Sequence, residues 1–328
     1  MASATTTPAI APSPTLVHLL DDELAFSPTL LGRFSNHLAM ALVALEQLGA
    51  GPDRLTAAFE AHARDESEPR DDRPALDAVI AEVERDGVAT TVQSRVARAA
   101  DAPSTALFHP MIRLAYALDV DHHGQVAAAL LDWERRHHAL PLPASEPGRR
   151  SLTDVAGDLS TGAWDPTFDL DAVARRRDLQ AALHGLAHDE LTLDDVSAFA
   201  IAAHLAADHF ITLHMVTSAC ALRALTAWLD DATATRLIAS TARAMVVTYA
   251  ATGAAPLLDA RELDAVRSAR LPSVDQIAEA AIADPDPHVI KLANVGLVEE
   301  ARTGDELYRF AAARAASLVP PARQLVAP

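Results

Sequence analysis

The sequence predicts an all-α protein that forms one large, bundle-like helical domain. Nearly every segment repeats its apolar residues at helical spacing, and almost none alternates apolar and polar residues as a strand does. Only 12 of the 328 residues are glycine and alanine is abundant, a composition that favours helices. Half of the residues are hydrophobic, so the chain can bury a large core.

The helices are expected where this periodicity runs between proline or glycine breaks. Proline is accepted in the first turn of a helix, and it begins the ranges that start at residues 28, 52, 74, 110 and 287. The charged residues 65–73 and the Pro- and Gly-rich residues 141–150 are expected to be exposed loops. In order, the expected helices cover residues 28–49, 52–64, 74–99, 110–118, 124–138, 170–188, 192–229, 232–252, 260–269, 274–283 and 287–318.

Three stretches divide the chain. Residues 1–14 are small and polar and read as a tail without the features of a signal peptide, residues 15–318 form the helical domain, and residues 319–328 form a C-terminal tail. No apolar run is long enough to span a bilayer. The lone Cys220 cannot form an internal disulfide, so a cytoplasmic location is expected.

Charge and motif content exclude several classes of partner. The formal net charge of −18 argues against nucleic acid and anionic membranes, because both favour clustered positive charge. No glycine-rich loop follows a strand, so a nucleotide-binding fold that holds a flavin or nicotinamide is not expected.

Lys291 is the only lysine, against 26 arginines, and it lies in an apolar run between Ile290 and Leu292. Arginine has the same charge, so surface charge does not explain why a lysine was retained here. A buried primary amine can act as a base or nucleophile, or bind carbon dioxide as an anionic carbamate, whereas a guanidinium cannot. The alternative is a partly buried lysine with its amine extended to solvent, retained by chance.

His288 lies three residues before Lys291, a spacing that places both side chains on one face of a helix. Asp286 followed by Pro287 is typical of a helix start, with Asp286 as N-cap. Both candidate residues therefore fall near the positive end of the helix dipole, which favours a neutral amine or an anionic carbamate.

Four of the fourteen histidines lie among apolar or small residues: His37, His109, His214 and His288. Singly, each is better explained as a hydrogen-bonded core histidine. Together, on different helices of one bundle, they resemble an inward-facing metal site. His204, on the helix expected to contain His214, is a further candidate ligand. His184 and His188 are four residues apart and could also bind a metal, but they are expected on a solvated surface.

The segments around these residues resemble the successive motifs of the questin oxidase-like family, which includes an oxidase of the aflatoxin pathway and enzymes that open anthraquinone rings. The resemblance runs in order from about Phe34 to Leu292. It rests on Asn36-His37-Leu38, His109-Pro110 with Ile112-Arg113-Leu114-Ala115-Tyr116, His214-Met215-Val216-Thr217-Ser218 with Ala221-Leu222-Arg223, and Asp286-Pro287-His288-Val289-Ile290-Lys291-Leu292. The chain departs from the family pattern at Ala39, where proline is expected, and at Cys220, where a small residue or histidine is common.

The resemblance implies a mononuclear non-haem Fe(II) centre that uses O2 on an aromatic polyketide such as an anthraquinone. Carried onto this chain, the metal ligands are His37, His109, His214 and His288, with Lys291 as a carbamate formed from CO2. Arg113, four residues after His109, could pair with a phenolate or carboxylate of the substrate, or equally form a structural ion pair. The nearest aromatic residues to these positions along the chain are Phe34, Phe108, Tyr116 and Phe210.

Three other functions stay open at the level of sequence. A lysine carbamate also bridges paired metals in hydrolases, although such sites favour extra carboxylates. A helical interaction protein with no catalysis would make Lys291 incidental. The third alternative is an oxygenase that needs no cofactor or that uses NADPH only transiently. Neither kind would bind a nucleotide tightly, which agrees with the absence of a nucleotide-binding motif.

Overall fold

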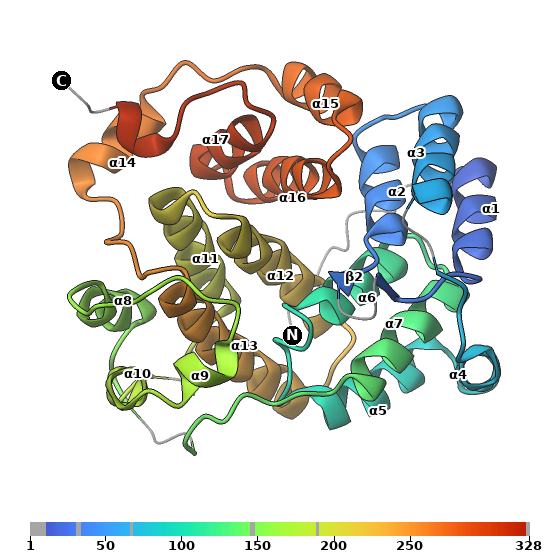
Figure 1. Ribbon diagram of the computed structural model, residues 1–328, viewed down its shortest axis with the longest axis horizontal. Coiled ribbons are helices and arrows are strands. Elements are labelled where there is room, and N and C mark those ends of the chain that lie inside the picture. The colour runs from blue at the N-terminus through green and yellow to red at the C-terminus, as the bar shows by residue number, and fades with distance from the viewer. Residues whose placement is uncertain (1–10, 31–33, 66–67, 145–147, 188–189, 326–328) are drawn as a thin grey trace.

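The computed structural model describes residues 11–30, 34–65, 68–144, 148–187 and 190–325, and within them it is an all-α fold (Figure 1). The two strands found in these residues are two residues long each and form one antiparallel hairpin. The predicted fold class is therefore confirmed. The boundaries predicted for the tails and the domain stay predictions, and most of residues 1–14 lies outside the described part.

The N-terminal part of the chain forms the right-hand side of Figure 1. Its elements are α1 (Pro14–Glu23), β1 (Thr29–Leu30), β2 (Phe34–Ser35), α2 (Leu38–Gln47), α3 (Pro52–Asp65), α4 (Arg73–Asp86), α5 (Val88–Ala99), α6 (His109–Asp119) and α7 (His123–Arg135).

The remaining elements fill the centre, the left and the top of that view. They are α8 (Leu152–Ser160), α9 (Leu170–Ala174), α10 (Arg177–Leu183), α11 (Leu193–Ala207), α12 (Phe210–Thr226), α13 (Asp231–Ala251), α14 (Ala260–Arg267), α15 (Val274–Ala283), α16 (Pro287–Thr303), α17 (Glu306–Ala315) and the short 3-10 helix η1 (Ala322–Leu325).

Three helices predicted as continuous are each broken by one residue with positive φ. Gly87 (φ 82°) separates α4 from α5, Asp208 (φ 45°) separates α11 from α12, and Gly304 (φ 71°) separates α16 from α17. A left-handed residue ends the run of backbone hydrogen bonds and turns the chain. The apolar periodicity continues across each break, which is why the sequence suggested single helices.

Other boundaries also differ from the prediction. The range 28–49 begins with the β1–β2 hairpin, and its helix starts only at Leu38. The range 170–188 contains two short helices, α9 and α10. Two helices were not predicted: α1, capped by Ser13, and α8, which begins with a capping box of Ser151 and Asp154. The described parts of the two predicted loops are free of helix except at the ends of the first, where α3 ends at Asp65 and α4 begins at Arg73.

Four helices form a closed ring at the centre of the fold. In the ring α2 contacts α6, α6 contacts α12, α12 contacts α16, and α16 contacts α2. In chain order three helices lie between α2 and α6, five between α6 and α12, and three between α12 and α16, so the ring helices are not joined by short antiparallel turns. This connectivity allows the N-terminal ends of all four to meet at one place.

The other helices cover this ring. α7 packs on α6, α17 on α16 and α3 on α2, while α11 and α13 both contact α12. The largest side chains inside this packing include Trp133, Tyr249 and Phe108, each at most 1% exposed. Residues in the predicted C-terminal tail also pack, since Ala322 of η1 is buried and η1 contacts α14.

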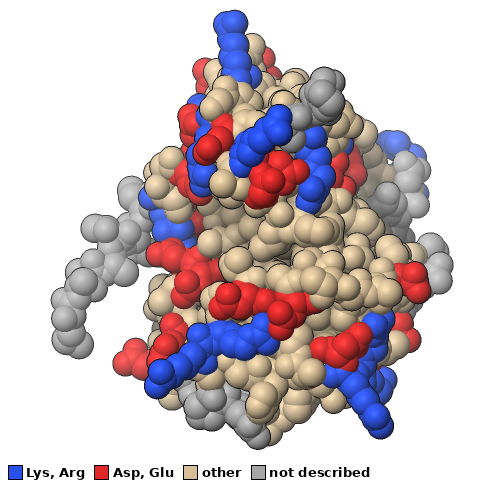
Figure 2. Space-filling model, turned by 90° about the vertical axis from the view of Figure 1, so that its left-hand side faces the viewer, with Lys and Arg blue, Asp and Glu red and all other residues tan. Residues whose placement is uncertain are grey.

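Charged side chains of both signs are interspersed on the face shown in Figure 2. Many arginines have acidic partners, for example Arg314 with Asp208 at 2.9 Å and Arg323 with Glu262 at 3.0 Å. None of the described helices has the length and apolar character that crossing a membrane requires.

Candidate metal centre

The four candidate histidines lie at the N-terminal ends of the four ring helices. His37 is the N-cap of α2, His109 is the first residue of α6, His288 is the second residue of α16, and His214 lies one turn into α12. Asp286 caps α16 by accepting a hydrogen bond from the backbone N–H of His288 at 2.8 Å, as the sequence predicted.

The four imidazole rings are in direct contact. The ring of His37 lies 4.5 Å from that of His109 and 4.4 Å from that of His288, centre to centre. His214 lies 4.8 Å from His109 and 5.3 Å from His288. One ring nitrogen from each histidine falls within 4.8 Å of all the others, a spacing at which four imidazoles could hold one metal ion.

The Nδ1 atoms of three histidines each have an oxygen partner outside the cluster. Nδ1 of His109 lies 2.5 Å from the carbonyl oxygen of Ala106, and Nδ1 of His214 lies 3.1 Å from that of Phe210. Nδ1 of His288 lies 2.8 Å from the Asp286 carboxylate. An oxygen acceptor favours a proton on Nδ1, and this tautomer leaves the lone pair on Nε2.

The Nε2 atoms of His109, His214 and His288 are buried and have no hydrogen-bond partner among the described residues. Buried polar atoms are normally paired, because an unpaired one loses its hydration without compensation. Three buried Nε2 acceptors of one cluster without partners in the described ranges are therefore suited to bind a cation.

The turn that leads into α6 is strained. Ala106, Leu107 and Phe108 have consecutive positive φ angles of 48°, 56° and 67°. The left-handed conformation costs a non-glycine residue about 1–2 kcal/mol. The turn brings the carbonyl oxygen of Ala106 to Nδ1 of His109. The strained residues therefore lie where they fix the orientation of the His109 ring.

The backbone at His37 is held in place by hydrogen bonds of the neighbouring Asn36 side chain. The Asn36 side chain accepts a hydrogen bond from the backbone N–H of Leu38 at 2.9 Å, within the first turn of α2. It donates to the carbonyl oxygen of Ser27 and to Glu23, which is fully buried. The backbone beside His37 is thus fixed by the packing of α1.

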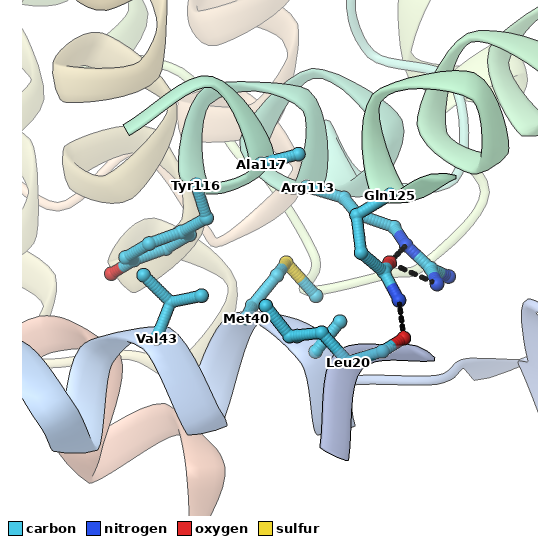
Figure 3. A pocket seen from close by; sticks show the side chains of 8 residues that line it. Leu20, Met40, Val43, Arg113, Tyr116, Ala117 and Gln125 are labelled. Atoms are coloured by element: carbon cyan, nitrogen blue, oxygen red, sulfur yellow. Dashed lines mark hydrogen bonds between the residues drawn. The ribbon is translucent and has the colours of Figure 1, made fainter. Parts of the chain in front are cut away.

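Arg113 is the second partner of Glu23. Its guanidinium donates to a Glu23 carboxylate oxygen at 2.5 Å. It also donates to the side-chain oxygen of Gln125 at 2.8 Å (Figure 3). Arg113 is 3% exposed and Glu23 0%. This is the structural ion pair that the sequence left open, and in the structure the guanidinium of Arg113 is directed toward α1 and α7 rather than toward the histidines.

Lys291 lies in the second turn of α16, and its side chain is completely buried. Its amine has no hydrogen-bond partner among the described residues. Burial lowers the pKa of this amine to about 7, while the nearby Asp286 acts in the opposite direction. A buried lysine without a carboxylate partner is rare, and this one adjoins four imidazoles.

The histidines are held in their neutral form. Burial lowers the pKa of His37, His109 and His214 well below the usual value, and Lys291 and the neighbouring rings lower it further. The pKa of His288 is lowered mainly by burial as well, against the opposing effect of Asp286. Neutral imidazole is the form that coordinates a metal.

These residues fit a transition-metal ion. Imidazole nitrogens suit iron, zinc, copper and nickel, and the described group contains no Asp or Glu that would favour calcium or magnesium. Lys291 in its amine form could not add an anionic ligand, whereas a carbamate on its Nζ would present oxygen to the same cluster.

The four candidate aromatic residues have different surroundings. Phe210 packs against His214 and His288, with ring centres 5.1 and 4.5 Å away, and is 48% exposed. Phe34 is also exposed, on β2. Phe108 is fully buried in the core, and Tyr116 donates a hydrogen bond to the Asn294 side chain at 3.1 Å.

The other histidines in the described ranges are not among the four that form the cluster. His204 was a spare candidate, but the break at Asp208 puts it on a different helix from His214, and its Nδ1 lies 3.1 Å from the Thr212 hydroxyl. His184 is exposed as predicted, and His188 lies outside the described residues.

Sequence reasoning missed a large cavity lined by the ring helices and α1. Its volume is about 690 Å³, within the usual range for small-molecule sites. On α6, α12 and α16 it is lined by the residues seven and ten positions after the histidine, which share its helical face. These residues are Tyr116 and Asp119, Ala221 and Ala224, and Val295 and Val298. The repeated spacing was a signal visible in the sequence.

Comparison with known families finds one similarity, over part of the chain. Residues 193–295 match the model of the family described as Questin oxidase-like, the family that the four motifs resemble. The match contains His214, His288 and Lys291, and it does not extend to His37 or His109. This similarity indicates an oxidoreductase. No curated protein matches the chain.

Proposed function

We propose that the protein is a non-haem iron-dependent oxygenase that uses O2 to oxidise an aromatic polyketide of the anthraquinone type, in a reaction such as oxidative ring cleavage. The observation that most supports this proposal is the fully buried amine of Lys291, which has no partner in the described part of the chain and lies beside four histidines, one ring nitrogen of each within 4.8 Å of the others. The Questin oxidase-like match gives independent support for an oxidoreductase.

The proposed ligands are Nε2 of His109, His214 and His288, a ring nitrogen of His37, and a carboxylated Lys291. In forming the carbamate, Nζ of Lys291 bonds to the carbon of CO2 and loses one proton, which gives an anionic oxygen ligand. Bound Fe(II) would supply the one-electron chemistry by which O2 reacts with an organic molecule. Ala106, Phe210 and Asp286 keep three imidazoles in the required tautomer.

The cavity between the ring helices is proposed to hold the substrate. It begins one helical turn beyond Lys291, at Asn294, and excludes bulk water there because Asn294 and Thr217 are almost completely buried. A dioxygenase reaction places both oxygen atoms of O2 in the product and needs no other reductant. A monooxygenase reaction would need two electrons from a donor such as NADPH.

The alternative functions have less support. A paired-metal hydrolase needs bridging carboxylates, and among the described residues the metal-ligand group contains histidines alone. A non-catalytic interaction protein would have no reason to leave three buried Nε2 atoms and a lysine amine unpaired.

Metal analysis combined with oxygen uptake tests the proposal. Protein loaded anaerobically with Fe(II) is expected to bind about one iron per chain and to consume O2 in the presence of a hydroxylated anthraquinone. His214→Ala should lower iron binding and oxygen uptake together, because an apolar buried site offers no replacement ligand. His184→Ala, on the surface, should change neither. Failure of the wild-type protein to bind iron would refute the proposed function.

A further inference from the structure

The cavity between α2, α6, α12 and α16, called the chamber below, differs in character at its two ends. The residues near the histidines are buried: Ile112, Thr217 and Asn294 are at most 4% exposed. The lining residues farthest along the helices, Asp119 and Val298, are exposed. The chamber is therefore open at the end away from the histidines.

Both acidic residues that line the chamber lie at its open end. Glu46 is the penultimate residue of α2, and Asp119 is the last residue of α6. The negative end of a helix dipole disfavours a carboxylate, so both positions carry a local electrostatic cost. No lysine or arginine is found among the chamber-lining residues in the described part of the chain.

The two carboxylates differ in their availability. The oxygens of Glu46 accept hydrogen bonds from the backbone N–H and the hydroxyl of Ser13, which fix α1 to α2. Asp119 is bonded by the side chain of Gln47, which also lines the opening. The protein atoms around the Asp119 carboxylate reduce its hydration and raise its pKa to about 6, while the Gln47 bond acts in the opposite direction, so the group is an anion at pH 8.

We infer that Asp119 is a specificity-determining residue of the chamber, which admits uncharged molecules with an outward hydroxyl group and excludes anions of the same size. The hydroxyl donates a hydrogen bond to the Asp119 carboxylate, while the ring system lies against Val43, Ala221 and Val295. An anionic molecule meets Asp119 and Glu46 at the opening, with no cation in the lining to offset the repulsion. This inference rests on the proposed function only in taking the chamber as the substrate site.

Isothermal titration calorimetry with two matched probes tests the inference. At about pH 8 the phenol 2-naphthol is uncharged and 2-naphthoate is an anion of nearly the same size. The full-length protein as purified is expected to bind 2-naphthol at least about tenfold more tightly, equivalent to about 1.4 kcal/mol. Asp119→Asn should reduce this preference to less than about threefold, and Asp264→Asn, on an exposed face of α14, should leave it unchanged.

A blocking variant shows whether the probes occupy the chamber. Ala224→Trp, at a partly exposed lining position of α12, should weaken 2-naphthol binding at least about tenfold, with folding checked by far-ultraviolet circular dichroism. If that variant does not fold, Val298→Trp at the opening replaces it. Equal binding of both probes, binding of neither, or an unchanged preference in Asp119→Asn would overturn the inference. Iron content is measured in parallel, so failure to bind iron refutes the proposed function without affecting this result.

Discussion

Two buried basic side chains of the ring helices, Arg113 on α6 and Lys291 on α16, have opposite surroundings. Arg113 is paired with the buried carboxylate of Glu23 and bonded to Gln125. Lys291 is buried at least as deeply and has no partner among the described residues. A buried charge is tolerated when a partner compensates for its lost hydration. The burial of Arg113 therefore has a structural explanation, and the burial of Lys291 does not.

Burial alone does not distinguish a structural cation from a functional one, but the presence or absence of a bonding partner does. Both residues lie in motifs that resemble one family, and from the sequence both could act in catalysis. The partner decides between them: Arg113 joins α1, α6 and α7, whereas Lys291 adjoins four imidazoles, three of which have an Nε2 without a partner among the described residues. The following substitutions test whether the two regions differ as this contrast implies.

The largest effect is expected at Lys291. Lys291→Arg and Lys291→Ala should both lower activity and iron content by more than about 100-fold, above the range typical of residues that only orient ligands. Arginine keeps the charge but cannot form a carbamate. Wild-type activity should fall when carbon dioxide is stripped and return with bicarbonate, and a small carboxylic acid should partly restore Lys291→Ala. Full activity in Lys291→Arg would refute the carbamate.

Substitution of the paired cation should act on stability instead. Arg113→Met leaves Glu23 buried without its cation and should lower the free energy of unfolding by about 3–5 kcal/mol, measured by urea denaturation. The double variant Arg113→Met/Glu23→Gln should recover part of this loss, because the amide removes the buried charge and its oxygen can still accept from one of the two donors, Asn36 or Gln125.

Lys291→Met provides the matched comparison in metal-free protein. It removes an unpartnered buried amine and should leave the free energy of unfolding equal or higher. The contrast between the two cations would be wrong if Lys291→Met and Arg113→Met were equally destabilising. Weaker substrate binding in Arg113→Met at unchanged stability would instead return Arg113 to the active site.

A smaller effect is expected from the partner of His288. Asp286→Ala removes the acceptor of the His288 Nδ1 proton and should weaken iron binding by about 10-fold, the lower range for groups that orient a ligand. Asp305→Ala is the control, because Asp305 caps α17 through the same type of bond, to the N–H of Leu307, and touches no histidine. Equal iron affinity in the two variants would leave Asp286 with a capping role alone.

The smallest effect is expected in the strained turn before α6. Ala106→Gly should raise the free energy of unfolding by about 1 kcal/mol, because glycine accepts a positive φ without strain. The same substitution at Ala57, exposed within α3, should lower it by about the same amount through helix propensity. A loss of stability in Ala106→Gly would show that the turn is not strained.

Helical class and several helix starts could be predicted because they depend on local interactions. The Asp286-Pro287 start of α16 and the exact bounds of α15 follow from capping and periodicity within a few residues. The breaks at Gly87, Asp208 and Gly304 were missed because the apolar stripe continues across them, and a single left-handed residue is decided by packing on both sides.

The sequence by itself determined that Lys291 and the four histidines are unusual, because their residue type conflicts with their apolar surroundings within one helical turn. Only the tertiary structure decided that the N-terminal ends of α2, α6, α12 and α16 meet, since the contacts between them join segments far apart in the chain. It also decided the partner of Arg113 and the existence of the chamber. Periodicity shows which face of a helix is buried, but the groups that face it come from other helices.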